Sequence, residues 1–369
     1  MQNRSTLLTG SGLILAVTTG AAAPDGQRLA YGPEAGTTVT RSIENTMAFE
    51  LDDMSMIVGG QDFGAMMGGM MMNLEFVNGA VLDDKLVAMG DGRPAHLERT
   101  ITEASQDMTM DIEVMGEGES QDVGYSAGLE GRTLVFKWDA ETSDYSVAFK
   151  NELEGDRPPI WSFEDLDLRS FLPTEEVDVD DSWEPTLDSL FGTFSLGGDL
   201  RWLPDMDEDL ADEMADMQAQ MEQMTQDLMQ EAMQSFGEAV EGDVEAIFKG
   251  TREEDGVNVG VIAISIDVQM TYDFADMIAE MVDAMGELED MPEDFFMEAD
   301  IATMDGAMEA EGVLLWNIGA GLPHSFDLEG DADFSIDFAG LVGAMDEEID
   351  MEMGMSMSGD FEHAVSVEL

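Results

Sequence analysis

The residues of this sequence that are best suited to chemistry are its methionines, of which there are 33 among 369 residues. Met351, Met353, Met355 and Met357 occupy every second position near the C-terminus. Thioether sulfur is a soft ligand that binds Cu(I), so one alternative is a soft-metal site. The other is the apolar face of a β-strand, because side chains at alternate positions share a face. The positions between them carry polar residues or glycine, which favours the strand.

A second methionine-rich segment, GAMMGGMMMN at 64–73, has no regular period and therefore indicates a loop. We predict that these methionines contact a hydrophobic ligand, as flexible methionine-rich surfaces do, or that some of them bind a soft metal. A further alternative is a surface loop that folds onto the edge of a sheet. The predicted ligand-binding residues are Met66, Met67, Met70, Met71 and Met72, and the soft-metal subset is Met66, Met70 and Met72.

Carboxylates are so numerous that pairs of them carry little information. Asp205, Asp207 and Asp209 have the spacing of the first ligands of a calcium loop, which makes them a candidate calcium site. The sixth position of that loop is Leu210 instead of glycine, and acidic residues also favour the start of a helix. A carboxylate-dependent hydrolase, with an acid pair like that of glycosidases, is the weakest functional alternative.

Other catalytic patterns are missing from the sequence. The chain has no cysteine, which excludes thiolate metal sites and a cysteine nucleophile. His96, His324 and His363 lie far apart, which predicts surface or strand-end imidazoles instead of metal ligands. There is no phosphate-binding loop and no nucleophile elbow. We therefore predict no catalytic residues and no cofactor, and we favour a binding protein over an enzyme.

The charge of the chain is extreme, with 82 acidic residues against 14 lysines and arginines and a formal net charge of −68. Such a surface repels nucleic acid and anionic lipid, so neither is an expected partner. The acidic side chains also repel one another. Salt screens this repulsion, because the Debye length is about 8 Å at physiological ionic strength. We therefore predict a halotolerant protein. The scarce arginines are candidates for buried ion pairs, namely Arg93, Arg99, Arg157, Arg169 and Arg201.

The N-terminus is typical of a secretory signal peptide over residues 1–22. Arg4 precedes an apolar run from Leu7 to Val17, and small residues follow before a cleavage site after Ala22. We expect export to the periplasm or the medium, with an N-terminal anchor as the alternative. Without cysteine the protein is not a lipoprotein. No later segment reaches about 18 uninterrupted apolar residues, so we expect no membrane span in the mature chain.

Most of the remaining chain alternates apolar and polar residues with a period of two, which indicates half-buried antiparallel strands. We predict a mainly β fold, a β-rich α+β protein with large curved antiparallel sheets. Two similar halves are one alternative arrangement. The N-terminal β region spans 23–160 and the C-terminal β region spans 204–369. Between them, residues 161–203 predict an ordered connector, because large aromatics there require burial.

Three local patterns are more specific. Residues 132–150 predict a β-hairpin, with apolar residues alternating along both arms and a polar turn between them. Residues 205–236 and 274–290 instead place apolar residues three and four apart, which predicts two amphipathic helices. Neither helix contains lysine or arginine, so each needs tertiary packing to be stable.

Two short motifs resemble a known family. LPTEEVDVDDSWE at 172–184 resembles a Pro…Val-x-x-Gly-Asp-Ser-Trp segment of a family of exported, β-rich bacterial proteins of unknown function. MGDGRPAHLERT at 89–100 is similar to a Gly-x-Pro-x-x-Leu-x-Arg segment from the same kind of protein. The resemblance implies export, a large antiparallel sheet and packing of Trp183 against the connector. It assigns no reaction, and Asp180 stands where the family often has glycine.

These observations favour a non-enzymatic protein with an apolar concavity. The expected partner is a hydrophobic ligand or another envelope protein. Cu(I) handling through methionine is the first alternative function, and the carboxylate-dependent hydrolase is the second.

Overall fold

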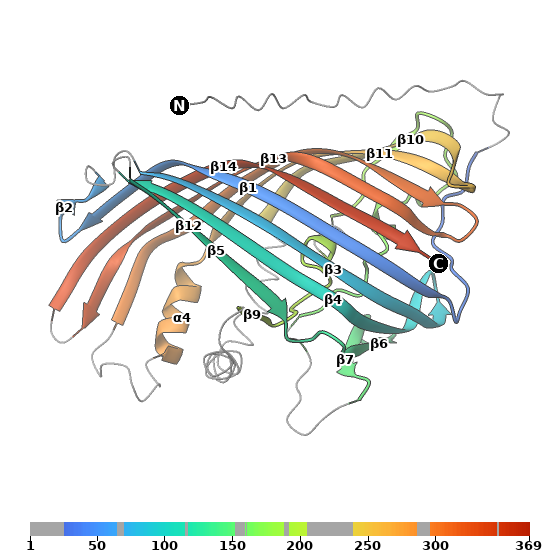
Figure 1. The fold of residues 1–369 in the computed structure, drawn as a ribbon, viewed down its shortest axis with the longest axis horizontal. Coiled ribbons are helices and arrows are strands. Elements are labelled where there is room, and N and C mark those ends of the chain that lie inside the picture. The colour runs from blue at the N-terminus through green and yellow to red at the C-terminus, as the bar shows by residue number, and fades with distance from the viewer. Residues whose placement is uncertain are drawn as a thin grey trace.

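The computed structural model describes residues 26–64, 70–114, 117–151, 159, 161–187, 192–204, 239–285, 296–344 and 347–369. Within these residues the chain forms one 14-stranded antiparallel sheet that curves like an arch (Figure 1). The predicted mainly β fold with a large curved antiparallel sheet is therefore confirmed. Its main strand order is β7-β6-β4-β3-β1-β14-β13-β12-β11-β10-β8, while β2 pairs with β1, and β5 pairs with β4 and β9.

The central strands are unusually long. Six of them contain 20 to 23 residues, namely β1 (Thr38–Val58), β3 (Met71–Gly90), β4 (Arg93–Val114), β12 (Phe296–Asn317), β13 (Leu322–Ala344) and β14 (Glu347–Glu368). At about 3.3 Å per residue such strands extend for roughly 70 Å. The other strands are β2 (Gln61–Asp62), β5 (Glu117–Ala127), β6 (Thr133–Asp139), β7 (Asp144–Phe149), β8 (Ser182–Trp183), β9 (Trp202–Pro204), β10 (Val240–Glu254) and β11 (Val257–Asp273).

The first and last long strands meet in the middle of the sheet. β1 pairs with β3 on one side and with β14 on the other, in a register that runs from Thr40 opposite Glu368 to Val58 opposite Met351. The N-terminal and C-terminal β regions therefore share one continuous sheet. The predicted hairpin over 132–150 is formed by β6 and β7, in which Phe136 lies opposite Val147.

The hydrophobic core lies under one end of the arch. There the inner face of the sheet is fully buried, for example at Ile43 of β1 and Phe326 of β13. The connector residues 161–187 and 192–204, which include the 3-10 helix η1 (Arg169–Phe171), lie beneath this face (Figure 1). Phe171 packs against Phe326 with ring centroids 5.9 Å apart. Trp183 donates a hydrogen bond from Nε1 to the carbonyl oxygen of Phe171 at 3.0 Å. The connector thus closes this end of the concave face.

A buried ionic network also ties the connector to the sheet. Asp84 of β3 accepts hydrogen bonds from Nε and Nη2 of Arg99, both at 2.7 Å, and from Nη1 of Arg41 at 2.5 Å. Arg41 pairs in addition with Asp167 of the connector, and Nη1 of Arg99 donates to the carbonyl oxygen of Phe163 at 2.6 Å. Burial on its own would raise the pKa of Asp84, but the guanidinium groups of Arg99 and Arg41 outweigh it and lower that pKa.

One helix packs under the other end of the arch. The helix predicted at 274–290 appears as α4 (Ala275–Met285), Phe274 lies just before it, and residues 286–290 lie outside the described part of the chain. The Asp273 carboxylate accepts a hydrogen bond from the backbone N–H of Ala275 at 3.0 Å, which caps the helix start. Ile278 of α4 is buried against Ala302 and Phe338 of the sheet. None of the helices that the structure describes is long and apolar enough to cross a membrane.

Several predictions fall on residues that the structure does not describe. These are the signal peptide at 1–22, the helix at 205–236, the candidate calcium ligands Asp205, Asp207 and Asp209, and the methionines Met66 and Met67.

Candidate functional site

The register of the sheet collects methionines from distant parts of the sequence on one surface. Met54 of β1 lies directly opposite Met355 of β14, and Met56 lies opposite Met353. Opposed residues of antiparallel strands have Cβ atoms about 4.5–5.5 Å apart, so these side chains are direct neighbours. A bulge between Leu51 and Asp53 shifts the register by one residue, which lets Met54 and Met56 share this face with the core residues of β1.

The apolar surface continues on both sides of these strands. Toward β13 and β12, Met355 lies opposite Ile336, which in turn lies opposite Met304. The rings of Phe49 and Phe334 meet edge to face with centroids 5.3 Å apart. We call this inner surface the methionine face, and its residues are Met47, Phe49, Leu51, Met54, Met56, Met72, Leu74, Phe76, Met108, Met110, Met304, Phe334, Ile336, Met351, Met353, Met355 and Met357.

Exposure separates the methionine face from the core. Both surfaces belong to the inner side of the sheet, because Met357, Phe361 and Val365 share one parity along β14. Val365 and its partner Ile43 are buried under the connector, whereas Met54, Met56 and Met355 are only partly buried. α4 covers part of the surface, where Ile278 and its neighbours pack close to Met351 and Met353. The methionine face is therefore a partly open continuation of the hydrophobic core.

The C-terminal methionine ladder is a β-strand, as the strand alternative predicted. Met351 to Met357 lie in β14 with their side chains on the inner face, and Met357 is 1% exposed. Glu352, Ser356 and Ser358 alternate with them on the outer face.

The aperiodic methionine segment is only partly visible. Met71 and Met72 begin β3, whose side chains alternate between the two faces, so Met71 is 54% exposed on the outer face and Met72 is partly buried on the methionine face. Met70 precedes the strand. The predicted site residues that the structure describes therefore do not all point toward one place. Met72 lies on the face described above, and Met71 lies on the opposite one.

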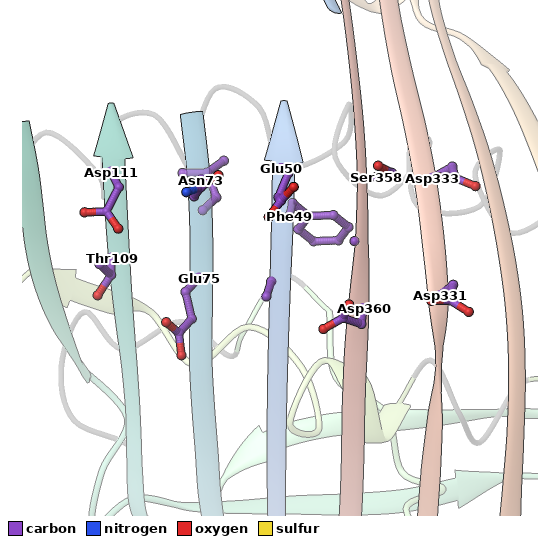
Figure 2. Close-up of a pocket in the computed structure, with 13 residues that line it drawn as sticks. Phe49, Glu50, Asn73, Glu75, Thr109, Asp111, Asp331, Asp333, Ser358 and Asp360 are labelled. Atoms are coloured by element: carbon purple, nitrogen blue, oxygen red, sulfur yellow. The ribbon is translucent and has the colours of Figure 1, made fainter. Parts of the chain in front are cut away.

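The outer face of the sheet is strongly acidic. A groove of about 560 Å³ crosses β4, β3, β1, β14 and β13, and Figure 2 shows Asp111, Glu75, Asp360 and Asp331 spread across separate strands. The register places acidic residues directly opposite one another along a row formed by Asp243, Asp267, Glu309, Asp331 and Asp360. Opposed like charges destabilise a sheet. Among the described residues no cluster of three or more acidic or histidine side chains is placed to hold a metal ion.

His363 is a buried core residue, so the predicted surface or strand-end imidazole is wrong for this histidine. Its ring stacks on Phe194 with centroids 4.5 Å apart. Asn45 donates its amide hydrogens to Asn78 Oδ1 and to the Phe194 carbonyl, so its own Oδ1 accepts from Nδ1–H of His363. Burial lowers the pKa of His363 to about 3, because a charged imidazole would be desolvated there. The sequence carries no signal of this packing other than the apolar neighbours of His363 in β14.

Comparison with known proteins identifies no family. No family model matches the chain, and no curated protein matches it. Among solved structures, the chain is similar to an outer membrane channel from Pseudomonas putida F1, with 10% sequence identity, coverage of 95% of this chain and 100% of that chain, and a TM-score of 0.19. It is also similar to OccK7 (OpdD) from Pseudomonas aeruginosa, with 7% identity, coverage of 89% and 99%, and a TM-score of 0.15. Similarity this low gives no information on function.

Proposed function

We propose that this protein is an exported, non-enzymatic binding protein whose methionine face takes a hydrophobic ligand or an apolar segment of an envelope protein. One observation carries the proposal. Outside the buried polar groups under the connector, the inner face of the sheet is mainly apolar, and the connector buries it at one end while the methionine face stays partly exposed at the other. Partly exposed, contiguous apolar surface is typical of binding sites, because leaving it in water costs about 25 cal/mol per Å².

The composition of the surface supports an adaptable partner. Methionine is unbranched and polarizable, so a methionine surface adjusts to ligands of different shapes. Phe49 and Phe334 add rigid aromatic area at its centre. The acidic groups lie on the opposite face of the same strands, which separates an apolar interior side from a highly charged exterior side.

Export is supported by the sequence pattern of residues 1–22 and by the resemblance to exported β-rich proteins. The carboxylate-dependent hydrolase lacks comparable support. The opposed acids that form the row from Asp243 to Asp360 on the outer face are all exposed.

The proposal is tested by titrating the purified protein with N-phenyl-1-naphthylamine, whose fluorescence rises in apolar surroundings. Met355→Gln keeps the side-chain length but places an amide on the methionine face. We expect about tenfold weaker binding, which corresponds to about 1.4 kcal/mol. Met71→Gln is the matched control, because Met71 is exposed on the outer face and its substitution should leave binding unchanged.

Two results would count against this function. The wild-type protein could give no saturable signal, or Met355→Gln could bind the probe as tightly as the wild type does.

A further inference from the structure

Two neighbouring cross-strand residue pairs of β1 and β14, on the same face of the sheet, consist of methionine alone. Met54 faces Met355 and Met56 faces Met353, and all four side chains lie on the inner face of the sheet. We call these four residues the methionine quartet. In sequence they form two pairs at opposite ends of the chain, so only the register reveals the group.

The spacing within the quartet allows the sulfurs to converge. Opposed Cβ atoms are about 4.5–5.5 Å apart, and residues two apart along a strand are separated by about 6.6–7 Å. The Cβ atoms therefore mark a small rectangle above one patch of sheet. Methionine has three rotatable bonds, so four thioethers can turn inward over its centre.

The composition of these two cross-strand pairs differs from that of the rest of the β1–β14 pair. Elsewhere on this face of the β1–β14 pair, each apolar cross-strand pair contains at most one methionine, as in Ile43 opposite Val365, Met47 opposite Phe361 and Leu51 opposite Met357. Within this strand pair, only the methionine quartet has methionine at both positions of two successive cross-strand pairs on this face. All four residues keep part of their surface exposed, and Met353 also packs at the edge of the cluster formed by Ile278, Ala302 and Phe338, so the quartet is not sealed in the core.

The chemistry of the quartet selects a soft cation. Thioethers are neutral, soft donors that prefer Cu(I) and bind Ca²⁺ or Mg²⁺ poorly. The residues that alternate with the quartet include Asp53 and Glu352, and the chain as a whole carries a formal charge of −68, so the local potential attracts cations. A thioether has no proton to lose near neutral pH, so protons do not compete with the metal for it.

We propose that Met54, Met56, Met353 and Met355 bind one Cu(I) ion through their four sulfur atoms. This site contains none of the subset Met66, Met70 and Met72, and it joins two methionines of the C-terminal series, for which the sequence raised a soft-metal site as one alternative, to Met54 and Met56 of β1. It is also independent of hydrophobic ligand binding, because leucine in place of methionine keeps the surface apolar while it removes the ligand atoms.

The test is an anaerobic titration of the full folded chain with Cu(I), with bicinchoninate as the competing chelator. We compare the wild type with the double variant Met54→Leu/Met355→Leu. The control is Met108→Leu/Met110→Leu, which removes two thioethers from the methionine face on β4. Methionine and leucine have similar volumes, so each substitution costs little stability and the variants should fold.

We expect the wild type and the β4 control to withdraw Cu(I) from the chelator with equal affinity, and the quartet variant to bind at least about tenfold more weakly. X-ray absorption of the copper-loaded wild type should show a first shell of sulfur only, and excess CaCl₂ should leave the copper bound. Three results would overturn the proposal: the chelator keeps all copper in the presence of wild type, the quartet variant binds as the wild type does, or the first shell contains oxygen or nitrogen.

Discussion

Acidification from pH 7 to pH 5 should destabilise the protein through a single buried imidazole, that of His363, whose side chain is 1% exposed. Nδ1 of this ring donates to Asn45, and Nε2 is buried with no hydrogen-bond partner. A proton on Nε2 would place a positive charge on a buried nitrogen that has no hydrogen-bond acceptor among the described residues. Burial therefore lowers the pKa of His363 to about 3 in the folded protein.

The sign and size of the effect follow from this pKa. An unfolded histidine has a pKa of about 6.5, so between pH 6.5 and pH 3 the unfolded chain binds a proton that the folded protein does not. The contribution of His363 to stability is complete above pH 6.5 and is lost as the pH falls. Each pH unit within this window costs about 1.4 kcal/mol, so the 1.5 units down to pH 5 amount to about 2 kcal/mol.

The assay is urea unfolding at pH 7 and pH 5 in about 1 M salt, which reduces the Debye length to about 3 Å and suppresses surface repulsion. The variant His363→Gln retains an amide donor toward Asn45 but does not titrate. His324→Gln is the control, because His324 is partly exposed. Between the two pH values, the wild type and the control should lose about 2 kcal/mol more than the His363 variant.

This comparison cancels the contribution of the surface carboxylates, which all three proteins share. If the wild type and His363→Gln lose the same free energy of unfolding on acidification, the buried, unpartnered imidazole is not the source and the reasoning is refuted.

Two further outcomes concern the charges of the protein. Asp84→Asn should lower the free energy of unfolding by about 3–5 kcal/mol in urea titrations, because it removes the carboxylate that pairs with buried Arg99 and one of the two carboxylates that pair with buried Arg41. Glu98→Gln, at a partly exposed ion pair with Lys150, should cost less than about 1 kcal/mol. Asp331→Asn should stabilise the protein by about 1 kcal/mol in 0.1 M salt, because it removes one charge that lies directly opposite two like charges, those of Glu309 and Asp360, with Cβ atoms about 5 Å away. That gain should disappear in about 1 M salt, and a gain of equal size in both salts would contradict the electrostatic explanation.

The strands were predictable because their signal is local. A period of two in β6 and β7, or in the C-terminal ladder of β14, reports which side chains share a face regardless of which strand lies next to it. The same holds for α4, whose apolar residues three and four positions apart are visible in the sequence.

The composition of the site was harder to predict. The aperiodic segment at 64–73 was predicted to form the binding site because it is rich in methionine. In the structure, however, Met71 and Met72 lie on opposite faces of β3. For the opposed methionines of β1 and β14, no sequence pattern indicates that the two strands pair with each other. The ion network was partly visible, since Arg99 was a candidate for a buried pair, whereas Arg41, which is 0% exposed, was not.

Periodicity and composition thus establish the strands, their inner faces, the acidic exterior and the scarcity of groups suited to catalysis, because each of these depends on neighbours along the chain. Strand order and register decide which faces are joined. They place Met54 and Met56 beside Met355 and Met353, bury His363 under Phe194, and direct the connector to one end of the arch. These features depend on contacts between residues that are hundreds of positions apart, and the free energy of such contacts is set by the packed sheet as a whole.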